Sequence, residues 1–223
     1  CYSLIMALNI NGTTGISGVD GSVSAPAVTG TDSNTGITFP SADTIKFATG
    51  GVERMAITNS GVSGITAGIT MVDSWVVTSN FSASSSTDIT SNWAKHSAGG
   101  SQFGTIGTGM TESSGIFTFP TTGIYMVHHT MSGQANSGAR PYLGMRQYYS
   151  TNSGSNYSVT SSGYSSGSGS TDHFVGSGTV IYDVTDASTH RIKFNVEPSS
   201  TTTYFGDSAN KNTGVVFIRL GDT

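Results

Sequence analysis

Two adjacent histidines, His128 and His129, are the one histidine cluster of this chain that could bind a metal or carry protons. They lie in a run of alternating apolar residues, which predicts a strand. Adjacent side chains of a strand point to opposite faces of the sheet, so the two imidazoles cannot easily share one metal ion. We therefore interpret them as satisfied or interface histidines.

Two groups of carboxylates could carry acid–base chemistry or hold a cation. Asp183, Asp186 and His190 lie within eight residues, but their segment reads Asp-Val-Thr-Asp-Ala-Ser, which is typical of a polar turn closed by backbone hydrogen bonds. Asp172 and Asp207 could hold a structural calcium ion, although no spaced Asp/Asn/Gly/Glu loop accompanies them. We expect no cofactor, and structural calcium stays open as an unsupported alternative.

The sequence offers little for catalysis. A glycosidase needs two carboxylates on neighbouring strand ends. Glu112 and Glu197 are the only glutamates after residue 70, and nothing in the sequence brings them together. Matches to a Gly-x-Ser-x-Gly nucleophile motif occur only in a stretch made of serine and glycine. We expect that the protein is not an enzyme.

Four tyrosines are the strongest candidates for binding. Tyr148, Tyr149, Tyr157 and Tyr164 are spread through Ser, Gly and Asn, the composition of antibody paratopes. Tyrosine supplies contact area at low entropy cost, and small residues adapt around it. The alternative is a long surface loop whose tyrosines cover strand ends. In both cases residues 150–170 are expected to be exposed and mobile.

The composition predicts which elements position these residues. The chain of 223 residues contains 36 Ser, 32 Thr and 30 Gly but only 22 charged residues. A disordered polar tract would have few aromatics and a high net charge, whereas this chain has 21 aromatics and a net charge of −4. Its excess of Thr, Val, Ile, Tyr and Phe favours strands over helices. The sequence therefore predicts an all-β protein.

Charge and hydropathy exclude several partners. Nine basic against 13 acidic residues disfavour nucleic acid, because neutralising phosphates takes clustered Lys and Arg. No apolar run approaches the ~20 residues that a membrane helix needs, so we expect no membrane insertion.

Cys1 is the single cysteine, which excludes an intrachain disulfide. Met6 is the expected natural start, and the origin of Cys1 to Ile5 stays open.

Aromatic residues divide the chain into two predicted regions. Residues 1–70 contain three aromatics, and residues 71–223 contain the other 18. Because a core needs large side chains to bury apolar area, the first region cannot form much of a core alone. Within residues 25–58, short apolar alternations separated by Pro and Gly predict a series of strands and turns. Such an extended segment is expected to be stable only against copies of itself or a larger platform.

This first region carries a resemblance. The stretch APAVTGTDSNTGITFPSADTIKFATGGVERMAIT, residues 25–58, resembles the N-terminal or shaft segments of bacteriophage tail fibres and related virion appendage proteins. The opening MALNINGTTGISGVDGS is similar to the start of such phage structural proteins. The resemblance covers about 60 residues and implies a segment that attaches to other virion proteins.

A proline corner carries the second resemblance. Phe117 and Phe119 share one face of a predicted strand, a turn follows at Pro120, and residues 124–131 form a strand that is apolar on both faces. Such a strand is expected where one face meets the opposite sheet and the other meets a second subunit. The run Gly-x-Phe-x-Phe-Pro-x-x-Gly-x-Tyr resembles the signature of the jelly-roll family of complement C-one-q globular heads and tumour necrosis factor.

Further segments agree with this family in order. Residues 73–83 resemble its first strand, 141–149 a middle strand, 173–197 the hairpin before the last strand, and 205–222 the closing strand. Residues 150–170 are an insertion without a counterpart. The resemblance implies a jelly-roll β-sandwich head, residues 71–223, that forms a compact homotrimer.

Three functions follow as expectations. The first is a trimeric tail fibre or receptor-binding appendage of a phage virion, contacting a glycan or protein of the host surface through the four tyrosines. The second is a capsid decoration or head-fibre protein. The third, a polysaccharide depolymerase, is disfavoured because no acid pair or nucleophile stands out. The first two place the protein on the virion, at the tail or the capsid surface.

Overall fold

The computed structural model of the chain consists of strands and connecting loops. Every regular element that it describes is a β-strand, and no described helix is long and apolar enough to cross a membrane. The chain divides into two compact units, Cys1–Ala67 and Gly68–Thr223, which are treated separately below. The predicted start at Met6 and the segment before it lie outside the described residues, which are 9–11, 15–17, 20–64, 68–96, 104–136, 138, 140–169 and 172–223.

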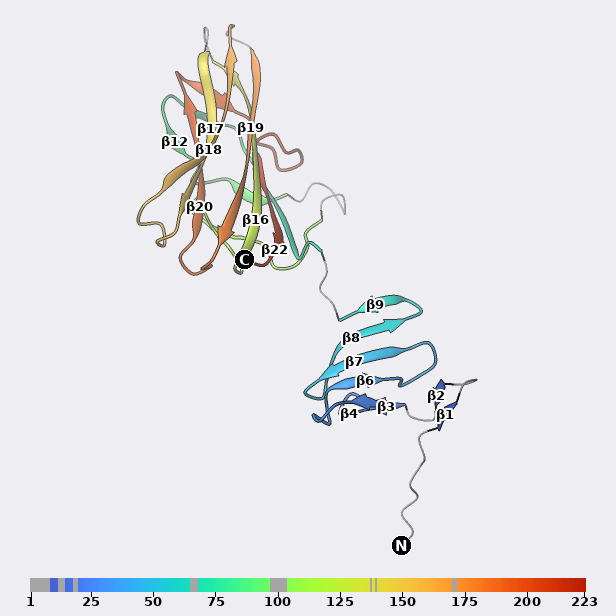
Figure 1. Cartoon of the computed structure of the whole chain (residues 1–223). Coiled ribbons are helices and arrows are strands. Elements are labelled where there is room, and N and C mark those ends of the chain that lie inside the picture. The colour runs from blue at the N-terminus through green and yellow to red at the C-terminus, as the bar shows by residue number, and fades with distance from the viewer. Residues whose placement is uncertain are drawn as a thin grey trace. The chain divides into compact units, whose positions relative to one another are not determined.

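The N-terminal unit is built on an antiparallel meander of five short strands, β5 to β9 (Figure 1). Two small hairpins, β1–β2 and β3–β4, precede it. The predicted series of strands and turns is therefore confirmed. The strand bounds are β1 Asn9–Asn11, β2 Gly15–Ser17, β3 Gly21–Ser22, β4 Ala25–Pro26, β5 Val28–Thr29, β6 Gly36–Thr38, β7 Ile45–Thr49, β8 Val52–Thr58 and β9 Gly61–Ser63.

The C-terminal unit is a sandwich of two antiparallel sheets. Sheet one has the order β11-β21-β16-β22-β10-β13, with β19 also paired to β16. Its bounds are β10 Met71–Val77, β11 Phe81–Ala83, β13 Trp93–Lys95, β16 Gly123–Ala135, β19 His173–Val184, β21 Thr202–Tyr204 and β22 Gly214–Gly221.

Sheet two has the order β14-β15-β20-β17-β18, with β12 paired to β20. Its bounds are β12 Thr87–Asp88, β14 Thr111–Ser113, β15 Ile116–Thr118, β17 Arg140–Ser150, β18 Ser158–Gly167 and β20 Arg191–Pro198. The predicted first, middle and closing strands correspond to β10 with β11, β17 and β22. The all-β sandwich predicted from the sequence is confirmed.

Aromatic side chains from both sheets form the centre of the core. The Phe117 ring makes edge contacts with Trp75 at 5.4 Å and Trp93 at 5.2 Å between ring centroids. It also contacts Phe194 of sheet two and Phe217 of sheet one, at 5.6 and 5.3 Å. Edge-on and tilted arrangements are the favoured geometries for aromatic pairs. The ring of Phe117 therefore contacts aromatic side chains of both sheets at the centre of the core.

The proline corner fixes how the chain passes from β15 to β16. Phe117 and Phe119 are both buried, as their shared face predicts. The ring of Phe119 packs edge-on against Tyr125, 4.9 Å away between ring centroids. The Tyr125 hydroxyl donates a 2.9 Å hydrogen bond to the carbonyl of Thr121, four residues upstream. Pro120 thus lies in a corner that is tied down by a buried tyrosine.

Strand β16 alternates without interruption between buried and half-exposed residues over its whole length. Odd-numbered residues, including Val127 and Met131, face sheet two and are fully buried. Even-numbered residues, including Met126, form the outer face of sheet one. The predicted strand with two partly apolar faces is confirmed.

The predicted hairpin over residues 173–197 is wrong. Its two strands, β19 and β20, lie in different sheets: β19 pairs with β16, and β20 pairs with β15 and β17. The turn at Asp186 therefore carries the chain from one sheet to the other. The alternation of apolar residues revealed two strands there, but it does not encode which strand each one pairs with.

The predicted loop over residues 150–170 is also wrong for about half of its length. Residues 158–167 form β18, an edge strand paired to β17. Strand β18 runs close to β19 of the other sheet, and a Cβ atom at Gly163 would lie 2.2 Å from the carbonyl oxygen of Ser177. Small residues are required because two backbones approach each other closely there.

Candidate interaction surfaces

The two histidines lie on opposite faces of β16, as predicted. His128 is on the outer face, with its Nδ1 atom 2.8 Å from the Thr179 hydroxyl. His129 is fully buried, with its Nδ1 atom 2.8 Å from Nε2 of Gln147. Burial, the neighbouring His128 and Lys211 together lower the pKa of His129 to about 4. Within the described ranges, no group of three or more His, Cys, Asp or Glu side chains is placed to hold a metal ion.

In the candidate group Asp183, Asp186 and His190, Asp183 lies in β19 and Asp186 builds the turn that follows it. Asp186 accepts hydrogen bonds from the backbone N–H and the hydroxyl of Ser188, at 2.9 and 2.6 Å, and these bonds lower the pKa of Asp186. The Nδ1 atom of His190 lies 2.6 Å from the Tyr149 hydroxyl rather than from an aspartate carboxylate. The interpretation of this segment as a polar turn is confirmed.

The other carboxylates are held separately. Asp172 accepts bonds from the N–H groups of Ser168 and Gly169, and Asp207 accepts one from the N–H of Ala209 at 2.7 Å. Glu112 accepts from the N–H of Gly115 in the β14–β15 hairpin. Across the sheet, the register places Glu112 level with Ile192, five residues along β20 from Glu197. Five residues span ~17 Å of strand, well beyond the separation in a glycosidase pair.

The four candidate tyrosines do not form one loop surface. Tyr149 lies on the inner side of β17, where its ring stacks on Tyr182 at 4.4 Å between centroids. Burial raises the pKa of Tyr149 to about 12. Tyr149 is half-buried and packs against the core, so it differs in setting from the other three tyrosines. The role of the four tyrosines in host contact stays a prediction.

Two of the remaining tyrosines surround one lysine. The Nζ atom of Lys193, on β20, lies 5.4 Å from the ring centroid of Tyr148 and 4.6 Å from that of Tyr157. The same ammonium group is paired to Asp88 at 2.6 Å. The charge of Lys193 is therefore balanced by Asp88. The contact of Lys193 with the Tyr157 ring holds the β17–β18 connection against the sheet.

Tyr164 belongs to a second group on the same outer face, defined here as the tyrosine–arginine site: Tyr142, Arg146, Tyr164 and Glu197. The sequence analysis missed Tyr142 and Arg146. Residues 142, 146 and 148 are all even-numbered positions of β17, so they face the same side of the sheet. Only the pairing of β17 with β18 and β20 brings Tyr164 and Glu197 beside them.

The outer face of sheet one carries a continuous apolar row. Register aligns Ile181 with Met126, Met126 with Ile218, and Ile218 with Val72, across four neighbouring strands. Ile181 is 54% exposed, and the other three are half-buried. A row of this kind is a candidate interaction surface, because soluble monomers seldom expose large contiguous apolar patches. We call Val72, Met126, Ile181 and Ile218 the apolar row.

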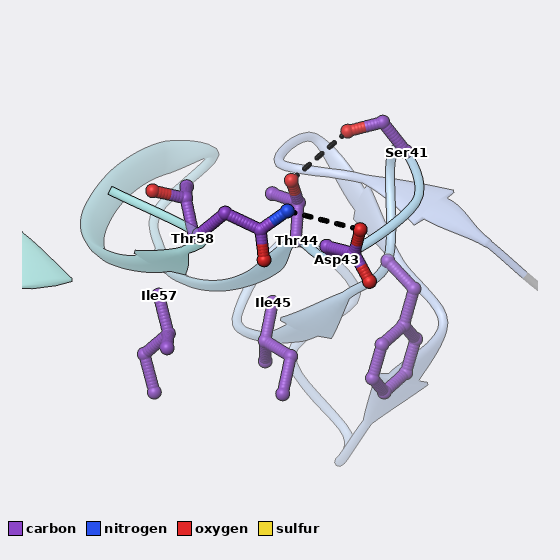
Figure 2. Close-up of a pocket in the computed structure, with 8 residues that line it drawn as sticks. Ser41, Asp43, Thr44, Ile45, Ile57 and Thr58 are labelled. Carbon is purple, nitrogen blue, oxygen red and sulfur yellow. Dashed lines mark hydrogen bonds between the residues drawn. The ribbon is translucent and has the colours of Figure 1, made fainter. Parts of the chain in front are cut away.

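The N-terminal sheet also has an uncovered apolar face. Register places Ile45 opposite Ile57, Ile57 opposite Val62, and Val28 opposite Ile37 on one side of the meander. Figure 2 shows Ile45 and Ile57 pointing the same way from adjacent strands, with polar residues gathered above them. They line a shallow depression of about 430 Å³ together with Phe39.

The polar side of this depression is ordered by its own hydrogen bonds. The Ser41 hydroxyl donates to that of Thr44 at 3.0 Å, and the amide nitrogen of Asn59 donates to Asp43 at 3.0 Å. Both bonds are drawn in Figure 2. The apolar face beneath them keeps Ile45 37% and Val62 60% exposed among the described residues.

Comparison with known proteins identifies the fold. No protein-family model matches the sequence, and no curated protein matches it. The structure of the Eiger tumour necrosis factor from S. frugiperda is similar at a TM-score of 0.52 and 10% identity, covering 70% of this chain and 96% of that one. The fold of the C-terminal unit is therefore a jelly-roll sandwich of the tumour necrosis factor type.

Two further solved structures are more distant. The globular domain of zebrafish complement 1qA protein has a TM-score of 0.42 and 17% identity, over 68% of this chain and 96% of that one. The PRD1 vertex protein P5 has a TM-score of 0.40 and 17% identity, over 70% and 100%. Because all these identities are low, the comparisons concern the fold and assign no function.

Proposed function

We propose that the protein is a trimeric structural protein of a bacteriophage virion, a tail fibre or receptor-binding appendage. The N-terminal unit attaches it to other virion proteins, and the jelly-roll head contacts the host surface. The observation that carries the proposal is that each unit has an apolar face that the described chain does not cover. Contiguous apolar faces mark sites of protein–protein contact, because burying them against another surface removes apolar area from water.

Copies of the same chain are the proposed cover for the apolar row. The jelly-roll family that the sequence resembles forms compact homotrimers. Met126 and Ile181 lie opposite each other on the paired strands β16 and β19 of sheet one. Three chains around one axis would bury the row of each. A specific interface buries more than about 1,000 Å² in total.

The position on the virion is tested by electron microscopy. Purified virions are labelled with gold-conjugated antibody against residues 68–223. We expect label at the tail, because the N-terminal segment resembles tail-fibre shafts. Label over the capsid surface would favour the second candidate, a capsid decoration or head-fibre protein. The absence of label on intact, protein-positive virions would overturn the proposal of an exposed virion protein.

We propose a binding role without catalysis. Glu112 and Glu197 are far apart along the sheet, and Glu197 is committed to an ion pair with Arg146. The protein incubated with host surface polysaccharide should release no new reducing ends. Release that Glu197→Gln abolishes would instead identify a depolymerase.

A further inference from the structure

The tyrosine–arginine site is a shallow depression of about 400 Å³ on the outer face of sheet two. Tyr142 and Tyr164 are each 45% exposed, and their rings meet nearly at right angles, with 6.2 Å between centroids. The two large aromatic rings contact each other at the surface, and the charged pair Arg146–Glu197 lies at the hydroxyl end of Tyr164. Together they form an exposed apolar surface with polar groups at its edge.

The site is held in one arrangement by its own bonds. Nε of Arg146 donates to the Tyr164 hydroxyl at 2.7 Å, and that hydroxyl donates to Oε2 of Glu197 at 2.6 Å. Nη2 of Arg146 forms an ion pair with the same carboxylate oxygen. The guanidinium carbon also lies 5.7 Å from the centroid of the Tyr164 ring. Oε1 of Glu197 is not used by any of these bonds.

The backbone beneath Tyr164 is shaped for the ring. Gly144 of β17 lies directly opposite Tyr164, and a Cβ atom there would come within 2.4 Å of the ring atom Cε1. Only glycine lets the ring lie against the strand. Because the ring and the ion pair are fixed before any ligand arrives, binding loses little side-chain entropy.

The charges decide the chemical class of ligand. Arg146 is neutralised by Glu197, so the site offers no net positive charge to a phosphate or sulfate. A neutral ligand with one apolar face and adjacent hydroxyls fits better. Its C–H face packs on the exposed rings, and its hydroxyls donate to carboxylate oxygen and accept from guanidinium N–H groups.

We propose that the tyrosine–arginine site binds one neutral pyranose ring of a host-surface glycan. The inference rests on the proposed attachment function and names its ligand class. It narrows the four candidate tyrosines to Tyr164 and adds Tyr142. A trimer carries three such sites, and avidity can raise a weak single-site affinity by roughly 10² to 10⁴.

The test is an array of immobilised neutral and anionic oligosaccharides, probed with the full chain. We expect binding to at least one neutral glycan, and at least a tenfold loss of apparent affinity in Tyr142→Ser. Glu197→Gln leaves Arg146 unpaired, so it should also lose neutral binding and gain retention of anionic glycans. A merely structural role for Glu197 would not change that selectivity.

The matched control is Val159→Ser. Val159 is 47% exposed on β18 of the same sheet but does not line the site, so this variant should bind like the parent. Equal melting temperatures show that the variants are folded. The proposal is overturned if the parent binds no neutral glycan on the array, or if Tyr142→Ser binds as well as the parent. If the same protein has the mass of a trimer and is labelled on the virion, the proposed function stands and only the glycan site is wrong. If it lacks both, the proposed function itself has failed.

Discussion

His129 is a neutral histidine enclosed between the two sheets. Its Nδ1 atom faces the Gln147 side-chain nitrogen, and Gln147 in turn accepts a 2.9 Å bond from the Tyr182 hydroxyl. The Nε2 atom has no hydrogen-bond partner among the described residues. A charged imidazole here would be buried beside Lys211 and His128, which accounts for its low pKa.

This residue should make the stability of the head depend on pH. The unfolded chain binds a proton at His129 below pH ~6.5, whereas the folded chain does so only below a pKa of about 4. Stability from this site is therefore complete above pH ~6.5 and is lost as the pH falls towards 4. We expect a loss of about 2–3 kcal/mol in unfolding free energy between pH 7.5 and 4.5.

Urea unfolding at the two pH values measures the effect. His129→Asn should flatten the dependence by about that amount, even if it lowers stability at both pH values. His128→Asn, on the half-exposed outer face, is the control and should keep most of the difference in unfolding free energy between the two pH values. If His129→Asn keeps the whole difference, another group is responsible for it.

Single residues were also where the sequence was most informative. The alternation around Phe117 and Phe119 predicted the buried face, and the adjacency of His128 and His129 predicted their opposite directions. Tyr142 and Arg146 could not be predicted as site residues, because their partners Tyr164 and Glu197 come from two other strands. Sequence patterns give the face of a residue but not its neighbour across the sheet.

At the scale of elements, the serine- and glycine-rich stretch is the instructive case. It has the composition of a loop, yet residues 158–167 form an edge strand. Its glycines serve the approach of β18 to β19, where a Cβ atom at Gly176 would lie 3.1 Å from the Gly163 carbonyl oxygen. Composition cannot distinguish a flexible loop from a strand that needs glycine because another backbone passes close to it.

Gly163→Ala tests this explanation. The added methyl group would meet the Ser177 backbone at 2.2 Å, and backbone cannot move aside without separating β18 from β19. We expect a destabilisation of about 1–3 kcal/mol, as for other overpacked sites. Thermal unfolding compares it with Ser162→Ala, the neighbouring residue on the same strand. Equal melting temperatures for the two variants would contradict the close-approach account.

At the scale of the whole molecule, the two units should differ in how they unfold. The described part of the N-terminal unit has few buried apolar residues, Ala48 and Ala56 being among them, and leaves its apolar face open. The head has a core that joins two sheets. We expect a fragment of residues 68–223 to unfold cooperatively in calorimetry and a fragment of residues 1–67 to show no sharp transition. A sharp transition in the shorter fragment would mean that it forms a core of its own.

Copies of this chain are proposed to cover the apolar row, and sedimentation equilibrium of the full chain tests whether they do. We expect three times the chain mass of 22.9 kDa for the parent. We expect a lower mass for Met126→Glu, which buries a charge at the interface. Val159→Glu, on the outer face of sheet two, should stay trimeric. A monomeric parent, or a Met126→Glu variant that remains trimeric, would contradict this proposal.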